Sequence, residues 1–289
     1  MRRLRERLRD INGKVLGSVF TWACSLAAGA FAIFPEKLFE QFEWFSKQWA
    51  WANIALNRVL AWLIIFVVVF IVSFIRLSFR KSVVFKGIDY KVCVEYGDLF
   101  DEAVYGNCKK VIAFDECFTV DVGDEPWQVK PGSICGKFLH SHPIDAEAMR
   151  QLIKNARLSS EPDGSKFRGK KRYASGKLVR YDDKFFLMSF AHLNENGSGV
   201  MSYDDYLSCL SVLWAELDKY RDGRDVCIPV IGSGDTTRLG DSSLTYQKLV
   251  DVILASYRLS GHKLGPDSCL RIVCLKDKDF SLNRVCDSL

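Results

Sequence analysis

Ile228-Pro-Val-Ile-Gly-Ser-Gly-Asp-Thr-Thr237 is the stretch that decides the fold. It begins as an apolar strand and runs directly into a turn that contains Gly232 and Gly234. Glycine lets the backbone approach a ligand closely, and successive N–H groups in such a turn can point at phosphate oxygens. The stretch is neither a Walker loop nor the G-x-G-x-x-G dinucleotide fingerprint. A phosphate-binding turn and an ordinary turn are therefore both open readings.

Apolar, β-branched runs elsewhere predict five more strands, over residues 82–85, 90–96, 111–114, 185–192 and 269–275. Amphipathic patterns between them predict helices over residues 143–158, 202–220 and 243–260. Because strands alternate with helices, we expect a layered α/β domain. The irregular stretch 159–180, rich in Ser, Gly and Lys, is expected to loop over the surface.

Two further strand ends carry polar residues. Asp98 follows Tyr96-Gly97 at the end of one predicted strand, where a carboxylate can accept hydrogen bonds from an adenine amino group or cap the next turn. Asp115-Glu-Cys-Phe118 follows the strand 111–114, and a long loop then reaches Gly132-Ser-Ile-Cys-Gly-Lys-Phe138. For this second segment, a ligand site and a plain surface loop are both open.

Together the three segments resemble the macro domain, a three-layer α/β/α sandwich with a mixed sheet that binds ADP-ribose and related nucleotides. The resemblance implies that Asp98 reads adenine and that the loops 132–138 and 232–236 clasp the diphosphate. It also suggests that Asp115 or Glu116 contacts the distal end of the ligand. The candidate ligand-binding residues are Asp98, Leu99, Asp115, Glu116, Phe118, Cys135, Gly136, Lys137, Gly232, Ser233, Gly234, Asp235 and Thr236.

Two apolar segments precede this domain. Residues 15–35 and 59–75 contain no charged side chain, and as helices they would extend about 31 Å and about 25 Å. We expect them to span a bilayer about 30 Å thick, the second with help from flanking arginines that reach the headgroups. A signal peptide and a buried core hairpin are the alternatives. The expected domains are a transmembrane region, 1–81, and a cytosolic nucleotide-binding domain, 82–289.

The distribution of lysine and arginine predicts the orientation of these spans. Six basic residues lie among the first fourteen, and four more follow the second span at Arg76, Arg80, Lys81 and Lys86. The intervening loop, 36–57, has only two lysines, which three glutamates offset. The positive-inside rule then places both termini and the domain in the cytoplasm. The ten cysteines contain no C-x-x-C pair and are interpreted as reduced thiols, which agrees with a cytoplasmic domain.

The resemblance becomes closer with Ile112–Phe118, Lys184–His192 and Ile228–Gly234, in that order behind two spans. This architecture is similar to the membrane-anchored macro-domain effectors of the bacterial type II Thoeris antiphage system. That similarity implies a TIR-domain partner that consumes NAD and makes an ADP-ribose-type signal, a histidine conjugate in type II systems. The macro domain would sense the signal, and the spans would then oligomerise in the inner membrane, disrupt it and abort the infection. No cofactor is implied.

One departure from hydrolytic macro domains bears on activity. Those proteins commonly carry an Asn at the strand end near the distal ribose and a Gly-Gly-rich first loop, whereas this chain has Phe114-Asp115-Glu116 and Ser133-Ile-Cys-Gly-Lys137. We therefore expect a sensor and no enzyme, and Lys137 suggests a pocket tuned for recognition. A membrane-tethered ADP-ribosyl hydrolase is the alternative, and an anchored scaffold with a vestigial pocket is a third reading.

Two other functions receive little support. The net charge is only +5, and the one basic stretch in the domain, residues 166–172, reads more readily as a solvated loop than as a nucleic-acid patch. His140-Ser-His142 lacks a third ligand nearby, so we expect no metal site there.

Overall fold

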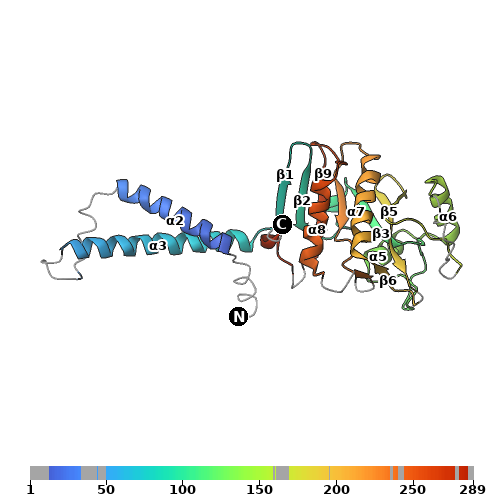
Figure 1. Cartoon of the computed structure of the whole chain (residues 1–289), viewed down its shortest axis with the longest axis horizontal. Helices are drawn as coiled ribbons and strands as arrows, with labels where there is room; N and C mark the ends of the chain where they lie inside the picture. The colour runs from blue at the N-terminus through green and yellow to red at the C-terminus, as the bar shows by residue number, and fades with distance from the viewer. Residues whose placement is uncertain are drawn as a thin grey trace. The chain divides into compact units, whose positions relative to one another are not determined.

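The computed structural model describes residues 13–33, 44, 50–158, 160, 169–194, 196–234, 237–239, 244–276 and 280–285 (Figure 1). The chain forms two compact units, residues 1–80 and 81–289.

The first unit contains two helices that pack against each other, α2 (Gly13–Ile33) and α3 (Ala50–Ser78). On α2, Val19, Ala23 and Ala27 recur every four residues, and all three are buried. Small side chains at this spacing let two helix backbones approach closely. The rings of Phe20 and Trp62 meet edge to face with centroids 5.8 Å apart.

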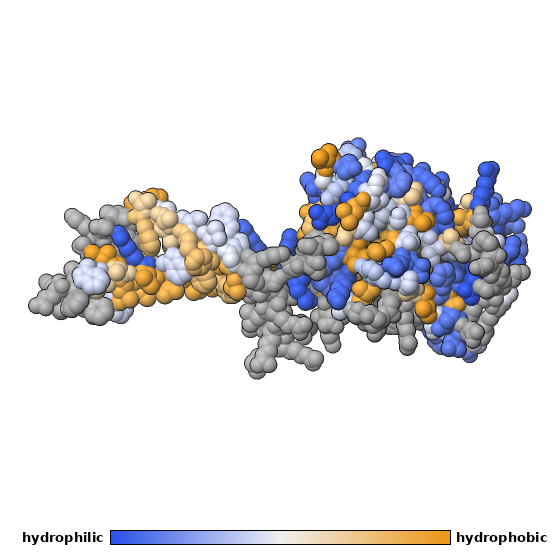
Figure 2. Space-filling view, in the orientation of Figure 1, coloured by the Kyte–Doolittle hydropathy of each residue, from blue (hydrophilic) through white to orange (hydrophobic). Residues whose placement is uncertain are grey.

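Both helices are long and apolar enough to cross a membrane. Large apolar residues are exposed along both, and Figure 2 shows them as orange surface. The second helix begins at Ala50, so the loop predicted over 36–57 is shorter than expected. With 29 residues, α3 is about 43 Å long, which exceeds a hydrocarbon core of about 30 Å.

The second unit is built on one mixed sheet. Its described strands are β1 (Ser82–Lys86), β2 (Lys91–Tyr96), β3 (Lys109–Asp115), β4 (Leu178–Arg180), β5 (Phe185–Leu193), β6 (Gly199–Met201), β7 (Val226–Pro229), β8 (Thr237–Leu239) and β9 (Cys269–Cys274). They lie in the order β1-β2-β9-β7-β3-β5-β6-β8, with β4 beside β5. From β2 to β5 the neighbours are parallel, whereas β1, β4 and β6 pair antiparallel with their neighbours β2 and β5.

The described helices of this unit are α4 (Glu102–Tyr105), α5 (Ile134–Ser141), α6 (Ala146–Asn155), α7 (Tyr203–Asp218) and α8 (Tyr246–Leu259), with a 3₁₀ turn η3 (Leu282–Arg284). Four of the five helices begin after a Ser, Asp or Thr whose side chain accepts a hydrogen bond from the third residue after it. Such a cap satisfies a backbone N–H that has no partner inside the helix.

Helices cover both faces of the sheet and create two cores. Along a strand, successive side chains point to opposite faces. On β3, Val111 therefore joins the core under α7 and α8, whereas Ile112 and Phe114 join the core under α4, α5 and α6. Figure 1 shows α7 and α8 side by side over one face. The three-layer α/β/α sandwich with a mixed sheet is confirmed.

The six predicted strands and three predicted helices are present, with ends that differ by a few residues. One prediction was wrong: residues 132–138 are not a continuous loop, because α5 begins at Ile134. The short β4 also interrupts the stretch 159–180 that was expected to be irregular.

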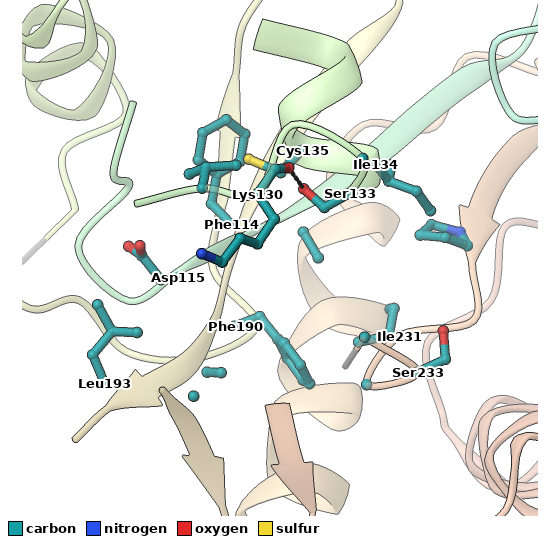
Figure 3. A pocket seen from close by; sticks show the side chains of 18 of the residues that line it. Phe114, Asp115, Lys130, Ser133, Ile134, Cys135, Phe190, Leu193, Ile231 and Ser233 are labelled. Atoms are coloured by element: carbon teal, nitrogen blue, oxygen red, sulfur yellow. Dashed lines mark hydrogen bonds between the residues drawn. The ribbon is translucent and has the colours of Figure 1, made fainter. Parts of the chain in front are cut away.

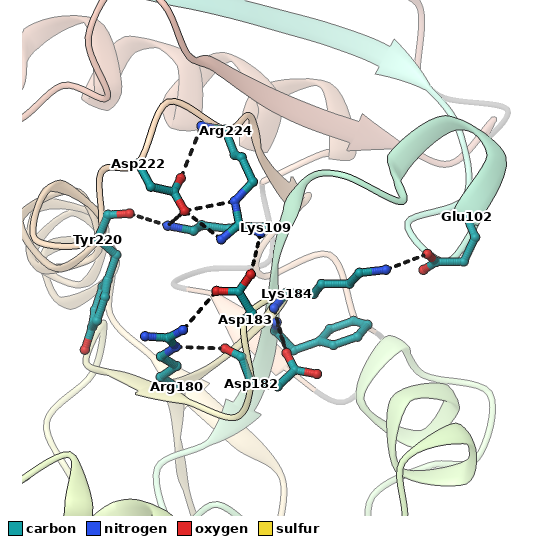
Figure 4. Close-up of polar contacts among 10 residues, drawn as sticks. Glu102, Lys109, Arg180, Asp182, Asp183, Lys184, Tyr220, Asp222 and Arg224 are labelled. Atoms are coloured by element: carbon teal, nitrogen blue, oxygen red, sulfur yellow. Dashed lines mark hydrogen bonds and ion pairs between the residues drawn. The ribbon is translucent and has the colours of Figure 1, made fainter.

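Ion pairs surround the amino end of β3 (Figure 4), whereas Asp115 is the last residue of that strand. Lys110 is fully buried, and its Nζ lies 2.5 Å from Oε1 of Glu102. Lys109 donates to the carbonyl of Tyr220 and pairs with Asp222 at 2.8 Å. A buried lysine would be costly without such partners, so loss of Glu102 would leave the charge of Lys110 uncompensated.

Candidate functional site

A cavity of about 600 Å³ lies where the parallel strands end. Its lining comes from the carboxyl ends of β3, β5, β7 and β9 and from the loops that follow them (Figure 3). In open α/β sheets this edge is the usual place for ligands, because loops diverge there to either face of the sheet. The strand order of the sheet therefore creates the site, because it brings together strands that are far apart in the sequence.

The turn Gly232–Gly234 forms one wall of the cavity. Gly232 has a φ of +86°, a backbone conformation that glycine adopts without strain. The Ser233 hydroxyl donates to the carbonyl of Val230 at 2.7 Å. From beneath, the buried hydroxyl of Tyr206 on α7 donates to the carbonyl of Ile231 at 2.9 Å. These bonds hold the turn in place while its glycines face the cavity.

The first turn of α5 forms the facing wall. Gly132, Ser133, Ile134 and Cys135 line the cavity, and Oγ of Ser133 caps the helix by accepting from the N–H of Gly136 at 3.0 Å. A helix N-terminus carries a partial positive charge and N–H groups that favour anions. The glycine turn and the N-terminus of α5 thus line the same cavity.

Lys130 and Asp115 are the only charged residues that line the cavity within the described part of the chain. The Lys130 ammonium donates to the carbonyls of Asp124 and Glu125. Figure 3 shows its side chain extended toward Asp115. This lysine precedes α5 by four positions, so it adds a full positive charge near the partial charge of the helix terminus.

Asp115 reaches the cavity through a β-bulge. The register of β3 against β5 shifts between Phe114 and Asp115, and both residues line the cavity. Bulges next to functional sites re-aim side chains in this way. The Asp115 carboxylate accepts from the N–H groups of Cys117 at 2.9 Å and Thr119 at 3.1 Å. Burial nevertheless raises the pKa of Asp115 above its ordinary value.

Apolar and aromatic side chains complete the lining, among them Phe114, Phe190 and Ile231 (Figure 3). The turn between β5 and β6 closes one side. Gly197 there has a φ of +79°, and a Cβ at this position would lie 2.8 Å from Cα of Trp127. Only glycine lets that turn approach the segment 126–130, which also lines the cavity.

The structure separates the predicted site residues into three groups. Asp115, Cys135, Gly232, Ser233 and Gly234 line the cavity. Asp98, Leu99, Glu116, Phe118, Gly136 and Lys137 lie outside its lining. Asp235 and Thr236 lie outside the described residues.

The second group has other contacts. Asp98 is exposed at the end of β2, and its Oδ1 accepts from the N–H of Phe100 at 3.1 Å. Leu99 and Phe118 are buried in the core under α5. Gly136 is buried against Lys130, and Lys137 is exposed on α5. The expected contact of Lys137 with a ligand stays a prediction, and Lys130 is the cation that the structure brings to the cavity.

Glu116 is fully buried and bonded within the fold. Its carboxylate accepts from the N–H of Leu193 at 2.7 Å, pairs with Arg172 at 3.2 Å and contacts Nδ1 of His192. It therefore ties β3 to the end of β5. Of the two neighbouring acids, the structure turns Asp115 to the cavity and Glu116 to the protein.

Sequence reasoning missed several lining residues, including Lys130, Trp127, Phe190, Tyr246 and Leu275. A signal existed only for Lys130, because it stands in Lys130-Pro-Gly132 directly before a glycine that was assigned to the site. Phe190 on β5 and Tyr246 on α8 carry no local signal, because aromatic residues in a strand or a helix are also expected where these elements pack into the core.

No group of three His, Cys, Asp or Glu residues in the described ranges could hold a metal ion. The ring of His142 stacks on Phe138 with centroids 4.9 Å apart.

Burial raises the pKa of the Cys135 thiol well above its ordinary value, so this cavity residue is an uncharged thiol and a poor nucleophile.

A family model described as the macro domain of Thoeris protein ThsA matches residues 92–275. The chain belongs to the Thoeris ThsA macro-domain family. The matched residues include all those that line the cavity. Thoeris protein ThsA of Bacillus amyloliquefaciens (strain Y2) is 28% identical over 222 residues, which cover 75% of this chain and 73% of that protein. The resemblance to Thoeris macro-domain effectors is thereby confirmed.

Solved macrodomains of Oceanobacillus iheyensis are more distant. One mutant form has a TM-score of 0.46 at 13% identity and covers 71% of this chain and 95% of its own. A second mutant, described with ADPR, has a TM-score of 0.45 at 13% identity and covers 70% and 95%. A form described with ADP has a TM-score of 0.44 at 12% identity and covers 70% and 93%.

The raised pKa of Asp115 makes a testable prediction for the stability of this domain. The folded chain keeps this proton while the unfolded chain releases it, so stability falls as pH rises from about 3.8 through the raised pKa. Asp115→Asn retains an oxygen acceptor for the two N–H groups and cannot ionise. We expect the melting temperature of Asp115→Asn to exceed that of wild type by an amount that grows toward neutral pH. Scanning fluorimetry across pH measures it, and parallel curves would contradict the assignment.

Proposed function

We propose that this chain is an antiphage effector whose macro domain senses an ADP-ribose-derived signal in the cavity at the carboxyl edge of the sheet. The observation that carries the proposal is that a glycine turn, Gly232–Gly234, and the start of α5 line the same cavity. A diphosphate between them would meet glycine backbone on one side and a helix N-terminus on the other. Family membership supports the same ligand class.

The rest of the cavity suits the other parts of such a nucleotide. Phe190 and Ile231 offer apolar surface to a base or a ribose face. Lys130 adds the positive charge that a diphosphate requires near it. Asp115 offers a carboxyl group to a distal substituent, which we propose to be histidine. Asp98 lies at the same edge of the sheet, at the end of β2, and we retain it as a candidate partner for adenine.

We further propose that a TIR-domain partner makes the signal from NAD and that the effector is a bacterial inner-membrane protein. Helices α2 and α3 would cross the bilayer as a hairpin with both termini in the cytoplasm. Their length and composition support this placement, and so does the excess of basic residues outside the connecting loop.

A stripe of small residues supports assembly of the spans. Gly17, Thr21, Ser25 and Gly29 recur every four residues on α2, and all four are exposed. They differ from Val19, Ala23 and Ala27, which are buried. The hydroxyls of Thr21 and Ser25 donate to carbonyls within α2, at 2.9 and 3.0 Å. One small face thus packs the hairpin, and a second is available to another copy.

The test of sensing is a thermal shift of the full chain in detergent with ADP-ribose as the probe. A ligand that binds only the folded state raises stability by about 2.7 kcal/mol when its concentration is about a hundred times Kd. We expect a rise of several degrees with ADP-ribose and none with AMP at equal concentration. Equal shifts with both, or no shift with ADP-ribose, would remove the proposal.

The small-residue stripe gives a prediction for the membrane output. A Cβ at Gly29 would meet no atom within 4 Å, so Gly29→Leu leaves the hairpin intact and blocks only close approach by another copy. We expect vesicles that carry the full chain to release a trapped dye on addition of ADP-ribose, and Gly29→Leu to lower that release at least about tenfold. Leu26→Ala, which trims an exposed side chain on the same helix, is the matched control. Undiminished release with Gly29→Leu would show that this face does not mediate assembly.

The hydrolase reading has a direct test. Incubation of the full chain with ADP-ribosylated protein or with O-acetyl-ADP-ribose should give no release of free ADP-ribose, because we propose recognition without turnover. Release that Asp115→Asn abolishes would favour the hydrolase, with Asp115 as its acid or base.

A further inference from the structure

β1 is the outermost strand on one side of the sheet. Its hydrogen bonds to β2 show which of its backbone groups point away from β2. It pairs antiparallel with β2 in a register that sets Ser82 against Glu95 and Val84 against Cys93. Just outside this ladder, the N–H of Tyr96 donates to the carbonyl of Lys81 and the N–H of Gly87 donates to the carbonyl of Tyr90.

These two bonds fix the phase of the ladder. In an antiparallel pair, residues alternate between those that exchange hydrogen bonds with the partner strand and those whose N–H and C=O point away from it. Because Lys81 and Gly87 bond toward β2, the residues at odd positions between them do the same. The backbone groups of Ser82, Val84 and Lys86 therefore point outward, and no strand in the described ranges pairs with them.

The side chains of this edge also leave it accessible. Val83 is buried in the core under α7 and α8, whereas Val84 on the opposite face is 47% exposed. An exposed strand edge with outward backbone groups is a template for another strand. Lysine at the edge, here Lys86, usually guards against indiscriminate pairing.

The edge is complementary to itself in one register. Antiparallel pairing of β1 with β1 of a second copy joins all three outward residues only when Val84 faces Val84, which sets Ser82 against Lys86 in both halves. A register that centres on Lys86 would place two lysines directly opposite each other, which is unfavourable. Pairing about Val84 is two-fold symmetric, so it closes as a dimer and cannot extend into a fibre.

The tether favours a second copy over a strand from another protein. Only three residues separate the end of α3 at Ser78 from Ser82, the first residue of β1. If α3 spans a membrane, as proposed above, every copy presents β1 close to the same membrane surface. Confinement of this kind raises the effective concentration of the partner strand. This step rests on the proposed function, whereas the edge geometry does not.

We propose that two copies of this chain pair antiparallel through β1, with Val84 facing Val84, and so join their sheets into one. The interface lies at the opposite end of the sheet path from β5 and β6, beyond the strands that line the cavity. It would hold the cytoplasmic units together, and the small-residue stripe of α2 would remain available for contacts in the membrane.

Cysteine cross-linking of the full chain in lipid vesicles tests the register. All variants carry Cys93→Ala, because Cys93 is registered with Val84 in the same chain and would capture a new thiol. Residues that exchange hydrogen bonds across an antiparallel pair have Cα atoms about 5.5 Å apart, within the range for a disulfide. We expect Val84→Cys to form a disulfide-linked dimer under mild oxidation, seen on a non-reducing gel.

The flanking positions supply the controls. In this register, Ser82 of one copy lies four residues along the strand from Ser82 of the other, which is roughly 13 Å. Ser82→Cys alone and Lys86→Cys alone should therefore cross-link at least about tenfold less than Val84→Cys, whereas a mixture of the two should cross-link well. If Val84→Cys cross-links no better than Ser82→Cys, the proposal is overturned. If the mixture fails, the register is overturned.

A backbone variant separates this interface from ligand sensing. In the mixture of Ser82→Cys and Lys86→Cys chains, Val84→Pro removes an outward N–H that does not bond to β2, so the fold retains its ladder. We expect Val84→Pro to abolish the cross-link and Val84→Ala to keep it. The thermal shift with ADP-ribose should survive in Val84→Pro, because the strands that line the cavity are unchanged. Cross-linking that persists with proline overturns the interface, and a lost thermal shift in wild type would bear only on sensing.

Discussion

Gly234→Glu is expected to abolish the thermal shift that ADP-ribose produces in the full chain, whereas Gly234→Ala is expected to retain most of it. Gly234 lines the cavity, and a Cβ built on it would meet no atom within 4 Å. Its φ also lies outside the left-handed region. Both substitutions are therefore compatible with the fold.

The difference between the two variants is charge. A glutamate at this position places a carboxylate where we propose that the diphosphate binds, between the turn and the start of α5. Two anions at about 4 Å repel by about 4 kcal/mol at an effective dielectric constant near 20. That repulsion lowers the affinity for ADP-ribose about a thousandfold. A ligand concentration of about a hundred times the wild-type Kd then no longer saturates the variant, and the stabilisation of about 2.7 kcal/mol is lost.

Melting curves of wild type, Gly234→Ala and Gly234→Glu, each with and without ADP-ribose, measure this effect. The three ligand-free melting temperatures should agree within a few degrees, which shows that the fold is intact. Should Gly234→Glu respond to ADP-ribose as strongly as wild type, the phosphate subsite would have to lie elsewhere.

The second large effect concerns Gly136. Alanine is the better helix former by about 1 kcal/mol, so helix propensity alone predicts that Gly136→Ala stabilises α5. The packing predicts the reverse. A Cβ at Gly136 would lie 2.2 Å from the carbonyl oxygen of Lys130 and 2.9 Å from Cα of Pro131, both backbone atoms that cannot rotate away. Overpacking of this kind costs about 1–3 kcal/mol. The smallest of these costs would equal the gain of about 1 kcal/mol in helix propensity, and any larger cost makes the variant less stable.

We therefore expect Gly136→Ala to lower the free energy of unfolding by up to about 2 kcal/mol and to displace α5 from the cavity wall. Loss of the ADP-ribose thermal shift should accompany it. Gly132→Ala is the control, because Gly132 lines the same wall and a Cβ there meets no atom within 4 Å. Chemical denaturation measures stability for both variants. If Gly136→Ala proves as stable as Gly132→Ala, the close approach of α5 to Lys130 is not required.

Local pattern was sufficient for most of the fold. Parallel strands buried on both faces read as continuous apolar runs, and this is why 226–231 and 269–275 could be placed before any contact was known. The long apolar runs near the N-terminus likewise identified α2 and most of α3. The strand-to-glycine junction at 231–232, a candidate ligand-binding turn, lines the cavity, and its signal lies within one short segment.

Local pattern was insufficient where a residue's role depends on distant partners. The side chain of Ser133 caps a helix over residues 134–141, although residues 132–138 were predicted as a loop. A serine can be recognised as a cap only when the residues after it are known to pack their apolar side chains as a helix. Lys130 lines the cavity because the segment 121–131 folds back on itself, with Val129 bonded to Asp121, and its end lies against Gly136 of α5.

Sequence alone determined that this chain has two apolar helices, a layered α/β domain and a glycine turn at a strand end, since each follows from a periodicity or a short motif. Tertiary structure alone decided which acid faces the ligand cavity. Asp115 and Glu116 are adjacent and chemically alike, yet the bulge in β3 turns Asp115 outward, and partners on β5 and at Arg172 bury Glu116. Those partners lie more than fifty residues away along the chain. No local pattern records them, because the sheet brings them together only when the whole domain is folded.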